Sequence, residues 1–325
     1  MLAVANFHYI RENFSTKYPS IFGLTPKQFK SQLKELSKYG NFVSQQEVLK
    51  GISQHEKAIL ITFDDGLREQ FELAKPILDE MGIPFICFVN TSNFTDRKVS
   101  LVHKIHLLRT VISPANLEKE IKNISSVELK DEEIEKAVAH YNYDDEDVAR
   151  LKYLLNFRLR ITEQKKIIEP LFLKYFEEEE TVSELYMDEN QLKVLWEEDR
   201  LGSHGHGHDP LGLLSREEVL NDLAKTQTYF ETKFGKKALT FSYPYGSYEA
   251  CKNLSLPLKK HGFKIAFTME RAVNKVVVKN SFMLARFDCN DLPGGKGNLL
   301  KENELFSNPY FAKWHDYEDG TAYQQ

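Results

Sequence analysis

Short apolar blocks alternate with amphipathic segments over the first ninety residues. Runs of apolar or β-branched residues predict buried strands, and apolar residues spaced three or four apart predict helices. The predicted strands are 2–10, 57–63 and 84–89; the predicted helices are 25–40, which Thr25 and Pro26 begin, and 67–81, which Gly82 follows. This order of elements is typical of parallel strands that are covered by helices on the outside.

The pattern changes between residues 94 and 186, where strand signals disappear. Helix-forming residues with charged faces predominate there, and the predicted helices are 102–111, 132–140, 148–159 and 163–176. We interpret residues 94–186 as a helical insertion between the first part of an α/β domain, 1–93, and its second part, 187–293. Two roles are open for this insertion: a cap over a site, or a contact between subunits.

The alternation of strands and helices returns after residue 187. Predicted strands are 200–203, 238–243, 263–268 and 283–287, and predicted helices are 188–198, 216–234 and 248–261. Residues 294–325 form a C-terminal tail without clear periodicity. The chain is therefore predicted to be an α/β protein whose single domain is interrupted by helices.

Composition and charge exclude several classes of protein. The net charge of −5 and the isoelectric point near 6.1 argue against a surface dedicated to nucleic acid. No apolar run approaches the roughly 18 residues of a membrane-spanning helix, and the N-terminus lacks the features of a signal peptide. Cys87, Cys251 and Cys289, an odd number at unrelated spacings, suit a reducing compartment. We therefore expect a cytoplasmic protein.

Two adjacent carboxylates follow the predicted strand 57–63. Asp64 and Asp65 repel each other at a strand end, and a bound cation would compensate for that repulsion. The alternative is that these residues and Gly66 form only a turn with a helix cap, because aspartate and glycine are common in both.

A histidine cluster follows the predicted strand 200–203. His204 and His208 are four residues apart, so both imidazoles can reach one cation if the backbone between them turns helically. Imidazole and carboxylate ligands together suit zinc or a neighbouring divalent ion. The alternative is a glycine-rich loop in solvent. We expect His206 to point elsewhere, as a supporting residue or a spectator.

Three motifs occur along the chain: Thr62-Phe63-Asp64-Asp65-Gly66, then His204 and His208 preceded by Gly202-Ser203, then Phe241-Ser242-Tyr243-Pro244-Tyr245-Gly246. In this order they resemble the polysaccharide deacetylase family, carbohydrate esterase family 4, over residues 1–93 and 187–291. The resemblance implies a distorted (β/α) barrel that carries a divalent metal, for which we expect Zn²⁺, and removes acetyl groups from N-acetylated sugars. By the same resemblance, the metal ligands are Asp65, His204 and His208, the catalytic base is Asp64, and the backbone N–H of Tyr245 stabilises the oxyanion.

The chain departs from the family pattern at two places. Many members have an arginine in the Pro-Tyr-Gly motif, where this chain has Ser242. We expect Arg286 to hold the catalytic base in its place. The alternative is that Arg286 belongs to an ordinary surface ion pair with Asp288, which would contribute little.

The second departure is the absence of the Leu-x-His motif near the C-terminus, which supplies the general acid in the family. His8, at the end of the first predicted strand, resembles the acid histidine of the circularly permuted branch that deacetylates poly-N-acetylglucosamine. On this interpretation His8 protonates the leaving amine. The alternative is a hydrogen-bonded histidine of the core.

Six of the candidate site residues lie at the carboxyl ends of predicted strands: His8, Asp64, Asp65, His204, Tyr245 and Arg286. In a parallel barrel these ends share one face, where such enzymes build their sites. We therefore expect a metal-dependent deacetylase that acts on an N-acetylated saccharide, without nucleic-acid partners. Two alternatives stay open: a hydrolase of another non-peptide C–N bond, and a non-catalytic, metal-stabilised protein that binds carbohydrate or serves in assembly.

Overall fold

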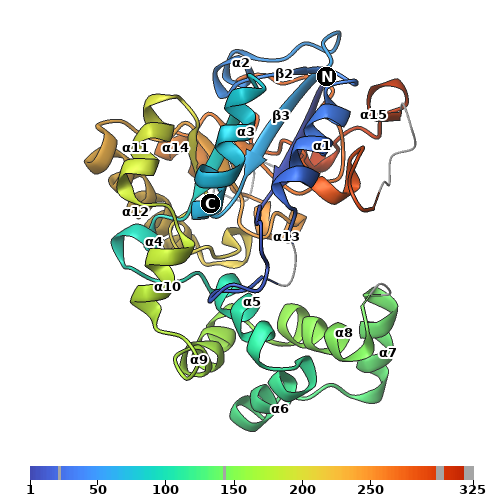
Figure 1. Cartoon of the computed structure of the whole chain (residues 1–325), viewed down its shortest axis with the longest axis vertical. Coiled ribbons are helices and arrows are strands. Elements are labelled where there is room, and N and C mark those ends of the chain that lie inside the picture. Colours follow the sequence, from blue (N-terminus) through green and yellow to red (C-terminus); the bar gives the residue numbers. More distant parts are fainter. Residues whose placement is uncertain (21–22, 142–143, 298–303, 318–325) are drawn as a thin grey trace. The chain divides into compact units, whose positions relative to one another are not determined.

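The computed structural model describes residues 1–20, 23–141, 144–297 and 304–317 (Figure 1). The chain divides into two compact units. The first, which we call the sheet unit, comprises Met1–Asn13, Gly23–Arg97 and Ser183–Gln325, and the helical unit comprises Phe14–Phe22 and Lys98–Val182. The helical unit overlaps the predicted insertion, 94–186. Parts of the predicted tail, 298–303 and 318–325, lie outside the described residues.

A single parallel sheet organises the sheet unit. Its strands are β1 (Leu2–Phe7), β2 (Asn41–Phe42), β3 (Ala58–Phe63), β4 (Phe85–Val89), β5 (Leu201–Ser203), β6 (Thr240–Ser242), β7 (Ile265–Phe267) and β8 (Phe287–Asp288). Their order is β7-β6-β5-β4-β3-β1-β8, with β2 also paired to β3, and every pairing between these strands is parallel. This arrangement confirms the predicted distorted (β/α) barrel.

The segment from Leu284 to Asp288 connects the two ends of the sheet. Leu284 pairs with Phe267 of β7, and two residues of β8 pair with Ala5 and Asn6 of β1. The predicted strand 283–287 is therefore wrong in its bounds, because this segment changes its pairing partner halfway. Arg286 lies between the two pairings, just before β8, and not at the end of a strand.

The alternation of side chains along the strands separates two apolar clusters. The inner cluster includes Leu2, Val4 and Leu60, and the outer cluster under the helices includes Ala3, Ala5, Phe7, Ile59 and Ile61. Successive strand residues point to opposite faces. The inner series therefore continues from Val4 to Asn6 and from Leu60 to Thr62 and Asp64, so that polar side chains replace apolar ones toward the carboxyl ends of the strands.

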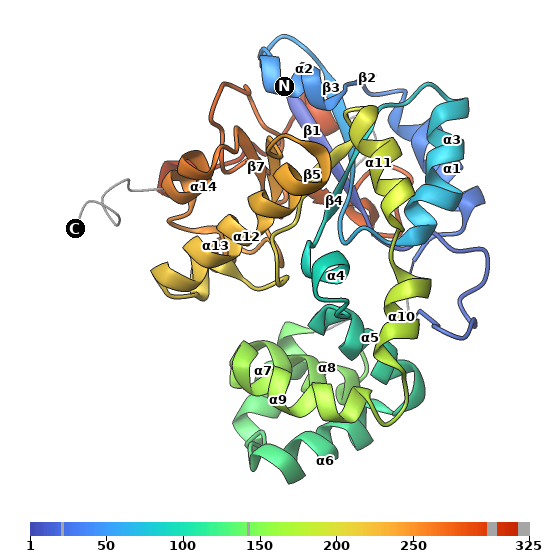
Figure 2. The same ribbon diagram turned by 90° about the vertical axis from the view of Figure 1, so that its left-hand side faces the viewer.

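Helices pack on the outer cluster of the sheet unit (Figures 1 and 2). They are α1 (Pro26–Leu36), α3 (Lys75–Glu80, preceded by a π-helical segment Gln70–Ala74), α4 (Ser92–Thr95), α11 (Glu189–Glu197), α12 (Arg216–Phe234), α13 (Tyr248–Cys251), α14 (Ser255–His261) and α15 (Glu304–Ser307). Helix α2 (Gln45–Lys50) instead adds Val48 to the inner cluster. The predicted helix 248–261 is in fact α13 and α14. Asn253 between them has a φ of 62°, a left-handed conformation that ends an α-helix.

The helical unit contains α5 (Leu101–Val111), α6 (Pro114–Ser125), α7 (Asp131–His140), α8 (Glu146–Tyr153) and α9 (Ile161–Phe172); α10 (Glu178–Leu185) runs from this unit into the sheet unit. Figure 2 shows α6, α7, α8 and α9 as a group of short helices. Helix α6, which the pattern analysis missed, begins with Ser113 as a cap and buries Leu117 and Ile121. Within the described residues, no helix has both the length and the apolar character needed to cross a membrane.

Candidate metal centre and active site

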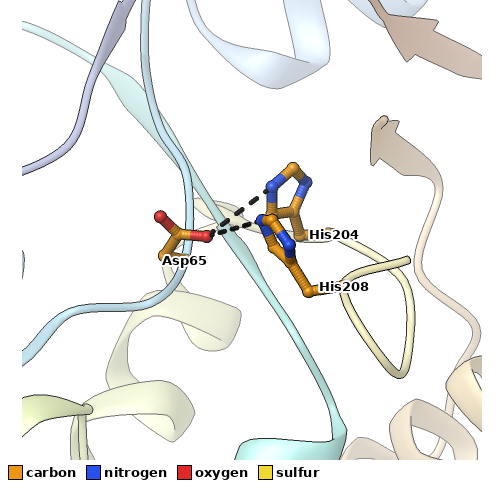
Figure 3. A group of neighbouring side chains, drawn as sticks. All are labelled: Asp65, His204 and His208. Carbon is orange, nitrogen blue, oxygen red and sulfur yellow. Dashed lines mark ion pairs between the residues drawn. The ribbon is translucent and has the colours of Figure 1, made fainter. Parts of the chain in front are cut away.

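Three side chains converge beyond the carboxyl ends of β3 and β5. Asp65 follows β3, and the loop after β5 supplies His204 and His208; all three side chains are buried. The distances from Asp65 Oδ1 to the Nε2 atoms of His204 and His208 are 3.7 and 3.3 Å, and one potential ligand atom of each residue lies within 4.8 Å of the others (Figure 3). The structure thus brings together the three predicted metal ligands.

The imidazole of His204 is oriented for coordination. Its Nδ1 lies 2.7 Å from the backbone oxygen of Ser242. A carbonyl oxygen can only accept, so Nδ1 carries the proton and Nε2 faces Asp65 with a free lone pair. Burial lowers the pKa of His204 to about 4, despite the opposing charges of Asp64 and Asp65. The ring is therefore neutral near pH 7, as a metal ligand must be.

The pKa of the second histidine, His208, shifts in the opposite direction. Burial would lower the pKa of His208, but the hydrogen bond and the charge of Asp65 outweigh burial and raise it.

Two imidazoles and one carboxylate are a common ligand set for a hydrolytic zinc ion. Ligand atoms about 2.1 Å from one tetrahedral ion lie about 3.4 Å apart, close to the separations within this cluster. The donor set therefore fits a divalent cation.

Arg286 holds the neighbouring carboxylate, Asp64, in a fixed position. Nη1 donates to Asp64 Oδ1 at 2.9 Å and Nη2 donates to Oδ2 at 2.8 Å, and both side chains are buried. The guanidinium also donates to Asn6 Oδ1, to Ser242 Oγ and to the backbone oxygen of Thr268, at 3.0, 2.8 and 3.0 Å. The alternative of an exposed ion pair with Asp288 is therefore wrong.

This contact sets the protonation state of Asp64. Burial alone would raise the pKa of the carboxyl, but the charge of Arg286 and its hydrogen bonds hold that pKa well below its ordinary value. Asn6 adds a hydrogen bond from Nδ2 to Oδ2 at 3.0 Å. Asp64 is thus ionised near neutral pH, and its Oδ2 lies 3.9 Å from Nε2 of His204.

The sequence matches the family model described as polysaccharide deacetylase, over residues 51–126 and 181–266. The chain belongs to the polysaccharide deacetylase family. Among solved structures, it is similar to the deacetylase PplD of Streptococcus pyogenes in complex with acetate, with 13% identity, a TM-score of 0.51, and coverage of 92% of this chain and 98% of that chain. A de-N-acetylase from Aggregatibacter actinomycetemcomitans gives 13% identity, a TM-score of 0.51 and coverage of 92% and 99%. At this identity, the likeness concerns the fold. The comparison with curated proteins gives no match.

In this deacetylase, Tyr245 lies beside the predicted ligands. Its ring centroid is 5.2 Å from that of His208, and its backbone N–H donates to no other described residue. Tyr245 has a φ of 63° and is followed by Gly246, with a φ of 65°. A Cβ at Gly246 would lie 2.4 Å from Met269 Cγ and 2.9 Å from its backbone nitrogen, so the turn requires glycine there.

His8 directly follows β1 and is half-buried. Its imidazole makes no hydrogen bond to another described residue, although it is close enough to Asp64 for its charge to lower the pKa of that carboxyl. The alternative of a hydrogen-bonded core histidine does not fit these observations. An imidazole with both nitrogens available is suited to proton transfer.

The sequence analysis missed Asp222, which positions the histidine loop. Its two carboxylate oxygens accept from the backbone N–H groups of His206 and Gly207 at 2.9 and 3.0 Å. Asp222 is a buried residue of α12, on the stripe that also buries Val219 and Leu223. The sequence could have indicated Asp222, because a carboxylate on the core-facing side of a predicted helix needs a buried partner.

His206 itself points away from the cluster. Its Nδ1 lies 2.9 Å from Thr91 Oγ1, and its Nε2 lies 3.4 Å from Asp96 Oδ2. The structure therefore agrees with the expectation that His206 is not a third imidazole ligand. Its contacts and those of Asp222 fix the loop from both sides.

Proposed function

We propose that this chain is a metal-dependent hydrolase that removes N-acetyl groups from a saccharide. The observation that carries the proposal is the buried cluster of Asp65, His204 and His208 beside a carboxylate, Asp64, that Arg286 keeps ionised. We further propose Zn²⁺ as the cation, because two imidazoles and one carboxylate leave a fourth position open. When bound, such a cation polarises the acetyl carbonyl and lowers the pKa of a water molecule toward about 7.

The side chains then divide the proton transfers between them. Asp64 accepts a proton as the oxygen of water bonds to the acetyl carbon; the carboxylate retains lone pairs for this although Arg286 and Asn6 occupy others. The backbone N–H of Tyr245 donates to the oxygen on which negative charge develops. His8 donates a proton to the sugar nitrogen as the C–N bond breaks, which leaves acetate and a free amine.

The same contacts bear on the alternatives. The absence of an arginine at Ser242 on its own favours a non-catalytic protein, but Arg286 supplies a guanidinium to Asp64 and also donates to the Ser242 hydroxyl. The position of His8 directly after β1 supports membership of the circularly permuted branch. The cytoplasmic location stays a prediction.

The first test is the dependence of acetate release on metal. Chelated wild type should release no acetate from an N-acetylglucosamine oligomer, and adding Zn²⁺ should restore the release. His204→Ala should stay inactive at the same Zn²⁺ concentration, because one of three ligands is gone, whereas His206→Ala, the matched control, should retain the metal. An inert wild type that binds Zn²⁺ would overturn the proposal, and release of ammonia or a ring-opened product from a cyclic amide would favour the other C–N hydrolase.

A second prediction concerns the general acid. His8→Ala should lower turnover by about 10²–10⁴-fold and leave the bound metal unchanged, because the leaving amine loses its proton donor. A leaving group that needs no protonation separates this role from a structural one: an aryl acetate ester, if it is accepted, should be cleaved by the variant nearly as fast as by wild type. Equal losses on both substrates would contradict the assignment.

A further inference from the structure

A buried glutamine, Gln70, contacts the backbone beyond the ends of both β1 and β3. Its Nε2 donates to the backbone oxygen of His8 at 3.1 Å and to that of Asp64 at 2.6 Å. Its Oε1 accepts from the backbone N–H of Leu67 at 3.1 Å. The side chain has no exposed surface, and its oxygen and both of its N–H groups bond to the protein backbone.

The regular pairing of β1 with β3 ends at this place. The last register pair is Phe7 with Phe63, and the backbone N–H of Asp64 donates to the oxygen of Phe7 at 3.3 Å. His8 and Asp64 each lie one residue beyond that pair. Because one planar amide bonds to the backbone oxygens of both residues, it fixes the distance between the two backbones where the strand pairing no longer does.

The local backbone around Gln70 is irregular. Gln70 is the first residue of the π-helical segment Gln70–Ala74, and its backbone oxygen accepts from the N–H of Lys75, five residues along the chain. Such π-helical turns are rare and often occur at functional sites. This irregular turn is therefore a second observation, independent of the hydrogen bonds of the amide, that marks Gln70.

The preceding residue, Glu69, holds the other end of the segment that follows β1. Its Oε1 accepts from the backbone N–H of Ile10 at 3.0 Å, and its Oε2 accepts from Nε of Arg11 at 2.6 Å. If the amide of Gln70 were lost, the segment would still be attached through Glu69. We therefore expect the backbone of His8 to shift without unfolding of the segment.

The proposed acid depends on its backbone more than the proposed base does. Two hydrogen bonds from Arg286 and one from Asn6 hold the carboxylate of Asp64. The imidazole of His8, in contrast, makes no hydrogen bond to another residue that the structure describes. The position of this ring is therefore set by its backbone, and a displacement of about 1 Å can lower a rate by about 10²-fold.

We infer that Gln70 is a positioning residue whose amide holds the general acid, His8, at a fixed distance from the general base, Asp64. The amide acts through the backbone oxygens of these two residues. This inference rests on the proposed function for the roles of His8 and Asp64. The position of the His8 ring can also be measured without catalysis.

Gln70→Met keeps the length of the side chain and removes all three hydrogen bonds of the amide. Gln227→Met is the matched control. The amide of Gln227, which is also buried in the sheet unit, donates to the backbone oxygen of Ala238 at 3.0 Å and accepts from its N–H at 2.9 Å. Both variants should lower stability, because each leaves buried backbone groups without a partner, but only Gln70→Met should displace the acid.

Turnover in single and double variants is the first test. Gln70→Met should lower acetate release from an N-acetylglucosamine oligomer by about 10–10²-fold. In a His8→Ala background the same change should lower it by less than about twofold, because residues that act as a unit have non-additive effects. Gln227→Met should have an effect of less than about twofold in either background.

Gln70→Glu gives a graded version of this test. Burial keeps the glutamic acid side chain protonated, so it can donate one hydrogen bond where the amide donates two. Its turnover should lie between those of wild type and Gln70→Met. If Gln70→Met does not fold, Gln70→Glu takes its place in the comparison of backgrounds.

Nuclear magnetic resonance is the second test and needs no substrate. In protein labelled with carbon-13 at histidine, the Cε1–H signal of His8 is identified by its loss in His8→Ala. This signal should move in Gln70→Met and in Gln70→Glu, because the ring is displaced. It should keep its position in Gln227→Met.

The outcomes separate the two proposals. A loss of turnover that is equally large in the wild-type and His8→Ala backgrounds overturns the positioning role, and so does a His8 signal that is unchanged in the Gln70 variants. A signal that moves, together with no acetate release by metal-loaded wild type, supports the positioning of His8 by Gln70 and overturns the proposed function.

Discussion

Replacing Arg286 with methionine is expected to lower the free energy of unfolding of the sheet unit by about 3–5 kcal/mol, the cost of leaving a buried charge without its partner. Asp64 would remain buried with Asn6 as a donor but with no opposing guanidinium. Urea unfolding followed by tryptophan fluorescence measures this unit, since Trp196 and Trp314 both belong to it.

Two further variants test the origin of that effect. Arg216→Met removes an exposed arginine from the first turn of α12 in the same unit, and it should change stability by no more than about 0.5 kcal/mol. Adding Asp64→Asn to Arg286→Met removes the isolated buried charge, so the double variant should be more stable than Arg286→Met alone. If Arg286→Met destabilises the unit no more than Arg216→Met does, the buried ion pair does not stabilise the fold.

The difference in the free energy of unfolding between wild type and Arg286→Met should depend on pH. The pKa of Asp64 is lowered in the folded state from its ordinary value of 3.8, so the pair stabilises wild type above that pH and loses its contribution as the pH falls. In Arg286→Met the buried carboxyl can be protonated instead of remaining charged. The gap between the two proteins should therefore narrow in acid.

Asp64→Asn is expected to lower turnover by about 10²–10⁴-fold, the usual contribution of a general base, while the protein still binds its metal. The amide cannot accept a proton from water, but Asp65, His204 and His208 remain in place. Acetate release and metal content after dialysis are the two measurements.

Asp65→Asn is the matched control for this variant, because the two aspartates are adjacent and both are buried. It should lose metal affinity together with activity, since the carboxylate between the two imidazoles is gone. An Asp64→Asn protein with wild-type turnover, or one that loses its metal as Asp65→Asn does, would contradict the separation of base and ligand.

Local sequence patterns were sufficient to predict β3 and β5 and the residues that follow them. The position of Asp64, Asp65 and His204 is set by the carboxyl ends of β3 and β5, and those ends are visible as the end of apolar runs. Because neighbouring parallel strands share one edge, the sequence could also predict that these side chains meet.

A contact between the guanidinium of Arg286 and the carboxylate of Asp64 could be expected from their opposite charges. The hydrophobic pattern around Arg286 does not predict how its segment reaches the site. Its segment pairs first with β7 and then with β1, and no periodicity in five residues specifies such a change of partner. Asp222 was missed for a related reason. Its function depends on backbone N–H groups some fifteen residues away, and only the folded chain shows that they point at its carboxylate.

The guanidinium of Arg286 donates both to the carboxylate of Asp64 and to the hydroxyl of Ser242, so positions 242 and 286 are neighbours in the site. This proximity limits which pairs of residues the two positions can hold. Arginine at both positions would crowd two cations onto Asp64, and arginine at neither would leave its charge uncompensated in the barrel interior. We therefore expect positions 242 and 286 to vary as a pair among relatives of this chain, with one arginine at either position.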